Sequence, residues 1–374
     1  MSKTLFIFGN HPTISRAEVL TVFPQLDISA SGPDFIAGEG VDATVVDLKR
    51  LGGVIKVAEV FAECDQLNYE QIAQFLQDNM GDGKLAWGAS MHGISLRELK
   101  TLLIGVKKEL QKAGRSARFV NKDFANLSSA QVELQGLLGK GIEIIAARSG
   151  RGYLLARTIA VQPFDDFKKR DYEKAARDAR VGMLPPKLAL MMINLGCGDA
   201  PPSDITVYDP FCGTGTVLVE AGLLGLGAHG SDLDPRMVAA AETNLNQLQL
   251  KGEVWQQDAA KSLAGKSWDV ENTAIVTEGY LGPVFSKLPD AKTREHVMRE
   301  LAGLYKNFFG WVRARRIVLT MPVYLESGRP RYFSSKMIQP VVEERGWERI
   351  DDGKLIYSRT NQVVGREITV WERR

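Results

Sequence analysis

The chain has 374 residues, enough for two or three domains, because single hydrophobic cores rarely grow beyond about 250–300 residues. Its apolar fraction of 44% and charged fraction of 25% are typical of soluble globular proteins, and it contains no apolar run of the roughly 18–20 residues that span a membrane. Three widely spaced cysteines and four histidines predict neither a disulfide framework nor a metal site, so we expect a reducing, cytoplasmic location and no bound metal.

The charge is distributed unevenly along the chain. Residues 100–190 contain 18 Lys and Arg against 9 Asp and Glu, a net charge of +9, whereas the rest of the chain carries −7. A basic block beside a mildly acidic remainder is typical of a protein in which one module binds a polyanion. Solvated helix faces rich in Lys and Arg produce the same composition, so charge alone does not identify the ligand.

The first 165 residues predict two small α+β modules, over residues 1–65 and 66–165. In the first, Ser15 and Glu18 have the spacing of a capping box, which predicts that a helix begins there. Ser95 and Glu98 predict a second capping box in the other module. The expected strands lie at 3–9, 34–37, 43–46, 55–61, 116–120, 142–147 and 152–160, and the other helices at 69–79, 95–113 and 128–138.

The pattern changes after a densely charged segment, residues 166–183, which we interpret as a basic linker. Pro185 and Pro186 then suit the first turn of a helix, where a missing N–H costs nothing. From Ile205 onward, strands, turns and helices alternate, which predicts a Rossmann-like domain with a doubly wound, mostly parallel sheet over residues 184–374. Two strands within 356–371 are expected to form an antiparallel hairpin that closes this sheet.

A glycine-rich turn follows the first strand of this domain. The sequence from Asp209 to Thr216 reads DPFCGTGT, and Gly213 and Gly215 allow the backbone to pass close to a ligand. A dinucleotide-binding loop would have a third glycine and direct a helix N-terminus at a pyrophosphate. The incomplete pattern therefore disfavours an NAD-dependent enzyme, and Asp209 suits a cationic ligand group without phosphates.

Two further carboxylates follow the next two strands. Asp232 ends the second strand, where a carboxylate can accept hydrogen bonds from both ribose hydroxyls. Asp258 follows the third strand and can accept a hydrogen bond from an adenine amino group. A single Asp at such a position is more often a helix cap, but three at successive strand ends beside the glycine turn predict an adenosyl cofactor.

DPFCGTGT together with GSDLDP, residues 230–235, resembles the methyltransferase domain of the THUMP-containing tRNA guanine-N2 methyltransferases. Residues 6–19, 118–132 and 177–195 are similar to the N-terminal, THUMP and connecting regions of the same family. The resemblance implies a class I methyltransferase that uses S-adenosylmethionine to methylate N2 of a guanosine in tRNA. It places Asp209, Gly213 and Gly215 around the methionine part, Asp232 at the ribose and Asp258 at the adenine. Phe211, Thr214, Leu233 and Ala259 complete the expected cofactor site.

The catalytic motif of this family is usually Asp/Asn-Pro-Pro-aromatic after the fourth strand, whereas the strand 273–277 is followed here by EGYLGP. The resemblance implies that Glu278 accepts a hydrogen bond from the target amine, that the carbonyl of Gly279 accepts a second, and that Tyr280 stacks on the base. Glu is one methylene longer than Asp and Gly lacks the φ restriction of Pro, so the turn is less pre-organised. A degenerate turn without catalysis is the alternative.

The expected RNA contacts are basic residues in the middle module and the linker: Arg115, Arg118, Lys122, Arg148, Arg151, Arg177 and Arg180. Two alternatives to tRNA guanine-N2 methylation remain open. One is amine methylation of rRNA or DNA, and the other is a non-catalytic RNA-binding protein with a vestigial methyltransferase fold.

Overall fold

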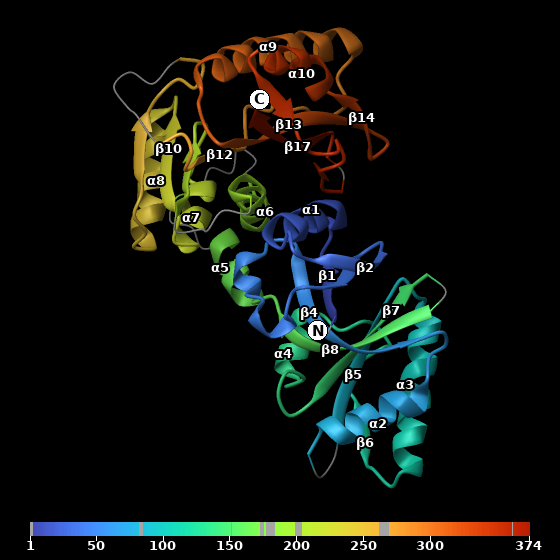
Figure 1. Cartoon of the computed structure of the whole chain (residues 1–374). Coiled ribbons are helices and arrows are strands. Elements are labelled where there is room, and N and C mark those ends of the chain that lie inside the picture. Colours follow the sequence, from blue (N-terminus) through green and yellow to red (C-terminus); the bar gives the residue numbers. More distant parts are fainter. Residues whose placement is uncertain are drawn as a thin grey trace. The chain divides into compact units, whose positions relative to one another are not determined.

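The computed structural model describes residues 3–81, 85–150, 152–172, 176, 184–198, 204–261, 269–360 and 362–374. The chain divides into two compact units, Met1–Asp166 and Phe167–Arg374 (Figure 1). Within the described ranges, we find no helix whose length and hydropathy would let it cross a bilayer.

The N-terminal unit is built on one mixed sheet of eight strands, in the order β2-β3-β1-β4-β8-β7-β5-β6. The strands are β1 (Lys3–Phe8), β2 (Asp27–Gly32), β3 (Phe35–Glu39), β4 (Val54–Cys64), β5 (Leu85–His92), β6 (Ala117–Phe119), β7 (Ile142–Ser149) and β8 (Gly152–Val161). β5 is parallel to β6 and β7, and the other neighbours are antiparallel. Strands from both expected modules share this sheet, and a division at residue 65 stays a prediction.

Two helices of this unit, α2 and α3, pack on β5 and β7 through an apolar core that contains Trp87 and Leu102. The capping box of Ser95 and Glu98 is confirmed at the start of α3. The helical segments are α1 (Pro12–Val22), α2 (Tyr69–Asn79), α3 (Leu96–Lys112), α4 (Ser129–Leu134) and the 3₁₀ turns Ala43–Val45 and Leu48–Arg50.

Two local predictions for this unit are wrong. Helix α1 begins at Pro12, so Ser15 lies inside it and its hydroxyl donates to the carbonyl of His11 at 2.9 Å. The buried carboxylate of Glu18 accepts instead from the N–H groups of Gly52 and Gly53, at 2.7 and 2.8 Å. Residues 43–45 form a 3₁₀ turn rather than a strand, because the side chain of Asp42 accepts from the N–H of Thr44.

The C-terminal unit has a sheet in the order β11-β10-β9-β12-β13-β17-β15. Its elements are α6 (Pro186–Cys197), β9 (Thr206–Asp209), α7 (Thr216–Leu223), β10 (Gly227–Asp232), α8 (Pro235–Gln247), β11 (Glu253–Gln256), β12 (Thr273–Thr277), α9 (Ala291–Trp311), β13 (Arg316–Glu326), β14 (Arg329–Phe333), α10 (Ser335–Glu343), β15 (Trp347–Arg349), β16 (Ile356–Tyr357) and β17 (Val364–Arg373). Helix α5 (Phe164–Tyr172) contains the boundary between the units. The first five strands in this order, β11, β10, β9, β12 and β13, are parallel, and β17 is antiparallel to both β13 and β15. This confirms the Rossmann-like fold with an antiparallel end. The expected hairpin partner of β17, the two-residue strand β16, pairs with it at two positions, and most of β17 pairs with β13 instead.

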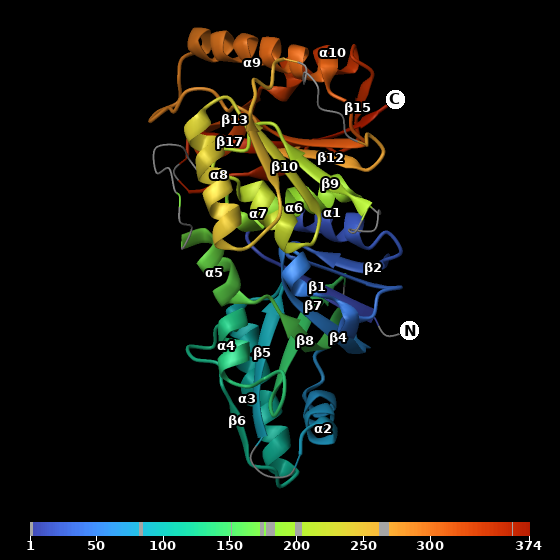
Figure 2. The same cartoon turned by 90° about the vertical axis from the view of Figure 1, so that its left-hand side faces the viewer.

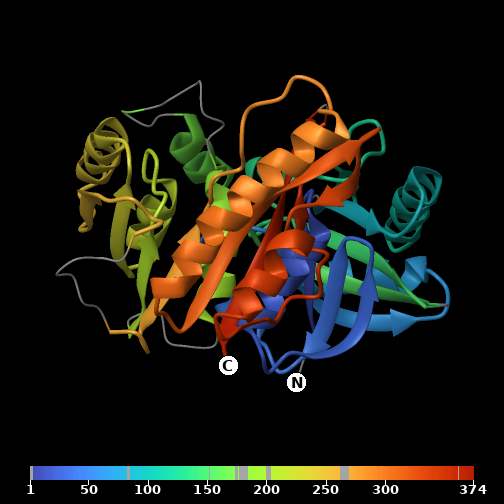
Figure 3. The same cartoon turned by 90° about the horizontal axis from the view of Figure 1, so that it is seen from above.

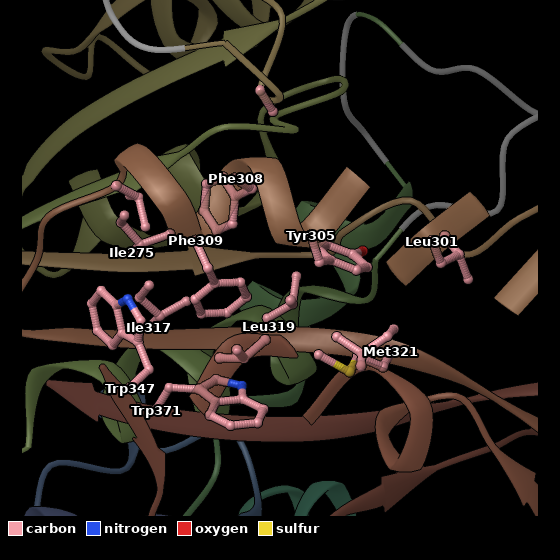
Figure 4. Packing of buried hydrophobic residues seen from close by; sticks show 14 of the residues in the cluster. Ile275, Leu301, Tyr305, Phe308, Phe309, Ile317, Leu319, Met321, Trp347 and Trp371 are labelled. Carbon is pink, nitrogen blue, oxygen red and sulfur yellow. The ribbon is translucent and has the colours of Figure 1, made fainter. Parts of the chain in front are cut away.

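Helices cover both faces of this sheet, which explains why its central strands, β12 and β13, are buried along nearly their whole length. On one face lie α9 and α10 (Figure 2), and Figure 3 shows α9 lying over the strands. Their core packs Tyr305, Phe308 and Phe309 against Trp347 and Trp371 (Figure 4). On the other face lies α6, where Gly196 lets the helix backbone approach the side chains of Val276 on β12 and Val318 on β13. Because β9 lies between β10 and β12, the order of the strands along the sheet reverses there, and sheets of this kind bind ligands at the carboxyl ends of the strands beside such a point.

Candidate active site

The glycine turn between β9 and α7 has two residues in the left-handed region. Gly213 has a φ of 51° and Gly215 a φ of 80°, and both values favour glycine. A Cβ on Gly213 would meet no atom within 4 Å, whereas one on Gly215 would lie 3.0 Å from Cβ of Ala241 on α8. Gly215 therefore serves helix packing, whereas the side of Gly213 where a Cβ would lie is open.

Asp232, at the end of β10, fixes this turn. Its Oδ2 accepts from the N–H of Gly213 at 2.9 Å, and its Oδ1 accepts from the N–H of Asp234 at 2.9 Å. A carboxylate offers about four acceptor positions, so capacity remains for a ligand. The next residue, Leu233, exposes 65% of its surface and presents apolar area beside the carboxylate.

Asp209, at the end of β9, is a buried acid of the site with a raised pKa. Its carboxylate is 2% exposed and accepts from the N–H of Phe211 at 3.0 Å and the hydroxyl of Thr277 at 2.6 Å. Burial is the main reason that the pKa of Asp209 is raised to about 7; the two hydrogen bonds oppose this rise, and the nearby negative charges of Asp232 and Glu278 add to it. The carboxylates that end β9, β10 and β12 therefore interact electrostatically, and their cluster suits a cationic ligand.

The raised pKa of Asp209 predicts the pH dependence of stability of the ligand-free protein. Because the folded state keeps a proton that the unfolded chain loses above its ordinary pKa, stability should fall between about pH 4 and pH 7 and then level off. A pKa near 7 corresponds to a loss of up to about 4 kcal/mol. In urea unfolding at pH 5 and pH 8, Asp209→Asn should remove most of this difference, and an equal decline in both proteins would exclude Asp209 as its source.

The other expected cofactor residues gather at the same strand ends. Asp258 accepts from the N–H of Ala260 at 2.9 Å and so caps the turn after β11, and the carbonyl of the buried Ala259 accepts from the indole of Trp311 at 3.0 Å. The ring of Phe211 meets Phe308 edge to face. Asp258 holds its own turn, so a role at an adenine ring stays a prediction.

The EGYLGP turn begins where β12 ends. Glu278 accepts a hydrogen bond from Nε of Arg366, a residue of β17. The hydroxyl of Tyr305, on α9, donates a hydrogen bond to the carbonyl of Tyr280 at 3.2 Å. Tyr280 itself is 51% exposed to solvent. Gly279 does not have a positive φ, but a Cβ there would lie 2.1 Å from the hydroxyl of Tyr305 (labelled in Figure 4). The turn is thus anchored from α9 and β17 while its aromatic ring faces water.

Three residues that hold this site carry no motif in the sequence. Arg366 and Tyr305 lie far along the chain from Glu278, on a strand and a helix that contain no recognisable motif. Asn244 of α8 donates to the carbonyl of Thr214 at 2.8 Å, and its amide also pairs with both backbone groups of Ala176. For Asn244, the sequence offers one indication of a special role: its amide lies on the buried side of an amphipathic helix.

The basic residues expected to contact RNA differ in their surroundings. Arg118 and Lys122 are exposed, at and just after β6. Arg115 donates to the carbonyl of Gly81 at 2.8 Å, and Arg148 pairs with Glu98 at 3.0 Å. Arg151, Arg177 and Arg180 lie outside the described residues.

The loop that carries Lys122 has unusual backbone geometry. Asp123 and Phe124 both have φ of 52°, a conformation that costs non-glycine residues free energy and persists where the surroundings enforce it. The amides of Asn121 and Asn126 enforce it by pairing with the backbone N–H and C=O groups of Ala89 and Met91 on β5, at 2.7–2.9 Å.

Comparison with known proteins agrees with this geometry. Residues 174–279 match the family model described as RMKL-like, methyltransferase domain, a segment that runs from before α6 to Gly279. A tRNA (guanine(10)-N2)-dimethyltransferase from Methanothermobacter thermautotrophicus is 36% identical over 134 residues, which cover 34% of this chain and 35% of the relative. The enzyme of that name from Pyrococcus abyssi is 30% identical over 206 residues, 50% of this chain and 58% of the relative. The chain thus matches between about a third and three fifths of the length of these relatives.

The likeness in fold extends further than the likeness in sequence. TrmN from Thermus thermophilus superposes with a TM-score of 0.51 at 16% identity, with full coverage of both chains. The SAH complex of SMU.472 gives a TM-score of 0.52 at 13% identity, over 98% of this chain and 97% of the other. The matched segment carries the glycine turn, Asp209, Asp232 and Glu278, and the part of the chain that is similar to an RMKL-like methyltransferase domain, residues 174–279, lies within the Phe167–Arg374 unit.

Proposed function

We propose that this protein is an S-adenosylmethionine-dependent methyltransferase that methylates the exocyclic N2 amine of a guanosine in tRNA. The observation that carries the proposal is the cluster of Asp209, Asp232 and Glu278 at the ends of three neighbouring strands, beside a glycine turn that is open at Gly213. The names of the relatives support tRNA guanine as the substrate.

The residues at these strand ends fit this cofactor. S-adenosylmethionine carries a sulfonium and an ammonium cation. A nearby positive charge would stabilise the ionised form of Asp209, a buried carboxyl whose pKa is near 7. Asp209 and the turn of Gly213 and Gly215, with Phe211 and Thr214, would surround the methionine part. Asp232 and Leu233 would hold the ribose, and Asp258 and Ala259 the adenine. When bound, the cofactor supplies an activated methyl group.

The protein's part in the reaction is alignment. Transfer of a methyl group from a sulfonium needs no strong base, so the rate depends on how well the amine is oriented. Glu278 would accept a hydrogen bond from the amine, and the carbonyl of Gly279 a second. The exposed ring of Tyr280 would stack on the target base, which is worth roughly 1–3 kcal/mol.

The proposal is tested by incubating the full chain with unmodified tRNA and methyl-labelled cofactor and analysing the nucleosides by mass spectrometry. Labelled N2-methylguanosine or its dimethyl form is the expected product. Label in another amine, or in rRNA or DNA alone, would redirect the activity to the alternative substrates. Binding of cofactor and tRNA with no transfer at all would instead favour a non-catalytic RNA-binding protein.

Cofactor binding should depend strongly on Asp232. Asp232→Ala should weaken binding by about 1.5–3 kcal/mol, because it removes a charged acceptor and releases the N–H of Gly213. The matched control is Asp234→Ala, which removes a helix cap in the same loop and should lower stability while changing the affinity little. Calorimetry that finds both variants equal in affinity would remove Asp232 from the site.

RNA binding by the N-terminal unit should be electrostatic. If Arg118 and Lys122 each contact a phosphate, replacing both by Ala should weaken tRNA binding and reduce the slope of log affinity against log salt by about 2. Lys49→Ala, at an exposed lysine outside the expected set, is the control and should leave the slope nearly unchanged. Equal slopes for wild type and the double variant would exclude both residues from the interface.

A further inference from the structure

The carboxylate that ends β12 is joined to the C-terminal strand by a buried ion pair. Nε of Arg366 donates to Oε1 of Glu278, although the two residues are 88 positions apart. The side chains are only 7% and 18% exposed. A charge pair so enclosed is costly to leave incomplete, because removing one partner leaves the other charge without compensation.

The structure holds Arg366 firmly. Its backbone lies opposite Pro322 of β13 and Tyr357 of β16, and its guanidinium lies 5.8 Å from the ring centre of Tyr357. The hydroxyl of Tyr357 in turn accepts from Nε of Arg359 at 3.2 Å. Arg366 of β17 and Arg359 of the loop between β16 and β17 therefore place positive charge near Glu278, and Tyr357 of β16 contacts both arginines.

We infer that Arg366 is a positioning residue, which fixes the carboxylate of Glu278 through Oε1 and keeps it in the ionised form that can accept a hydrogen bond from the target amine. This inference rests on the proposed function. A carboxylate accepts about four hydrogen bonds, so the bond from Arg366 leaves capacity for the amine. The ion pair also compensates for the absence of the family's usual Pro after the acidic residue, because the guanidinium orients a side chain that is one methylene longer than Asp.

Four titratable or charged groups face Glu278 from the elements around it: Arg366, Arg359, Tyr305 of α9 and Asp209 of β9. Burial raises the pKa of Glu278, whereas the charges of Arg366 and Arg359 lower it. Without Arg366, burial is opposed mainly by Arg359, and the carboxyl should keep its proton to a higher pH. A protonated carboxyl can donate a hydrogen bond but is a poor acceptor for an amine N–H.

The test compares Arg366→Gln and Arg366→Lys with wild type and with a matched control, Arg316→Gln. Arg316 pairs with Glu372 between β13 and β17, so its loss removes a half-buried ion pair of the same sheet away from the site. Two readouts are measured: single-turnover methyl transfer to tRNA against pH at saturating cofactor, and the titration of the Glu278 carboxyl by ¹³C NMR, assigned with Glu278→Gln. The second readout needs neither cofactor nor turnover.

We expect the single-turnover rate of methyl transfer by Arg366→Gln to be at least tenfold lower than that of wild type at pH 7 and to recover as the pH rises. The acidic limb of its pH–rate profile should be displaced to higher pH by about one unit or more. The NMR titration of Glu278 should move by the same amount. Arg366→Lys should lose several-fold in rate with the limb near that of wild type, because it keeps the charge but not the planar Nε donor. Arg316→Gln should keep the profile of wild type.

An unchanged Glu278 titration in folded Arg366→Gln overturns the inference, and so does a loss of rate that is uniform across pH, which would indicate a structural role alone. If Arg366→Gln does not fold, Arg366→Lys decides, and a rate equal to wild type overturns the inference. Failure of the proposed function is distinct, because it appears as wild-type protein that transfers no methyl group to tRNA whatever the NMR titration gives.

Discussion

Glu278→Ala should lower the single-turnover rate of methyl transfer by about a hundredfold or more. The substitution removes the acceptor that orients the target amine, and misalignment of a reacting nitrogen is worth at least about 2.7 kcal/mol of barrier. Cofactor affinity should change far less, because Asp209, Asp232 and the glycine turn remain. Quenched-flow measurement on tRNA with labelled cofactor gives the rate directly.

The ion pair complicates this variant, since Glu278→Ala leaves the guanidinium of Arg366 buried without its partner, at a stability cost of about 3–5 kcal/mol. The double variant Glu278→Ala/Arg366→Leu separates the two effects. It removes both charges and should recover stability in urea unfolding while the rate stays low. If either variant transfers methyl groups at the wild-type rate, the EGYLGP turn is not the catalytic motif and the assignment of amine methylation fails. Glu278→Gln should be milder, about tenfold, since an amide oxygen still accepts a hydrogen bond.

Gly279→Ala and Gly279→Pro should both disrupt the turn, although proline is the usual residue of the family at this position. The φ of Gly279 is not in the left-handed region, so backbone strain is not the reason. An added Cβ would lie 2.1 Å from the hydroxyl of Tyr305 and 2.6 Å from Cδ1 of Leu319, both fully buried. Displacing Tyr305 would also break its hydrogen bond to the carbonyl of Tyr280. Overpacking of this kind costs typically 1–3 kcal/mol, and we expect a loss of rate of at least a hundredfold from the shifted turn.

A second-site variant makes this prediction specific. Tyr305→Phe removes the atom nearest to the added Cβ, so Gly279→Ala/Tyr305→Phe should regain part of the stability lost in Gly279→Ala, leaving the contact with Leu319. Gly303→Ala, on α9 where a Cβ meets no atom within 4 Å, is the matched control and should be neutral or stabilising. Full activity of Gly279→Pro would show that the turn adapts and that Tyr305 does not restrain it.

Features that depend on local chemistry could be predicted from the sequence. The Rossmann-like sheet followed from apolar strands alternating with helices, and the glycine turn followed from Gly213 and Gly215, whose positive φ values confirm why glycine stands there. Asp209, Asp232 and Asp258 were predicted to follow successive strands, and they lie at or just after the ends of β9, β10 and β11, because carboxyl ends of parallel strands share one edge of a sheet. The capping box of Ser95 was also predicted correctly, since all its hydrogen bonds lie within four residues.

Features that depend on partners distant along the chain could be recognised only in the folded structure. Ser15 and Glu18 have the same spacing as a capping box, yet Glu18 bonds to Gly52 and Gly53, which no local pattern can reveal. The raised pKa of Asp209 depends on burial by the whole sheet, and the requirement for glycine at position 279 depends on Tyr305, 26 residues later along the chain. Arg366 joins Glu278 because β17 inserts antiparallel beside β13, and the free energy that selects this register comes from packing along the whole strand, not from the residues of the motif.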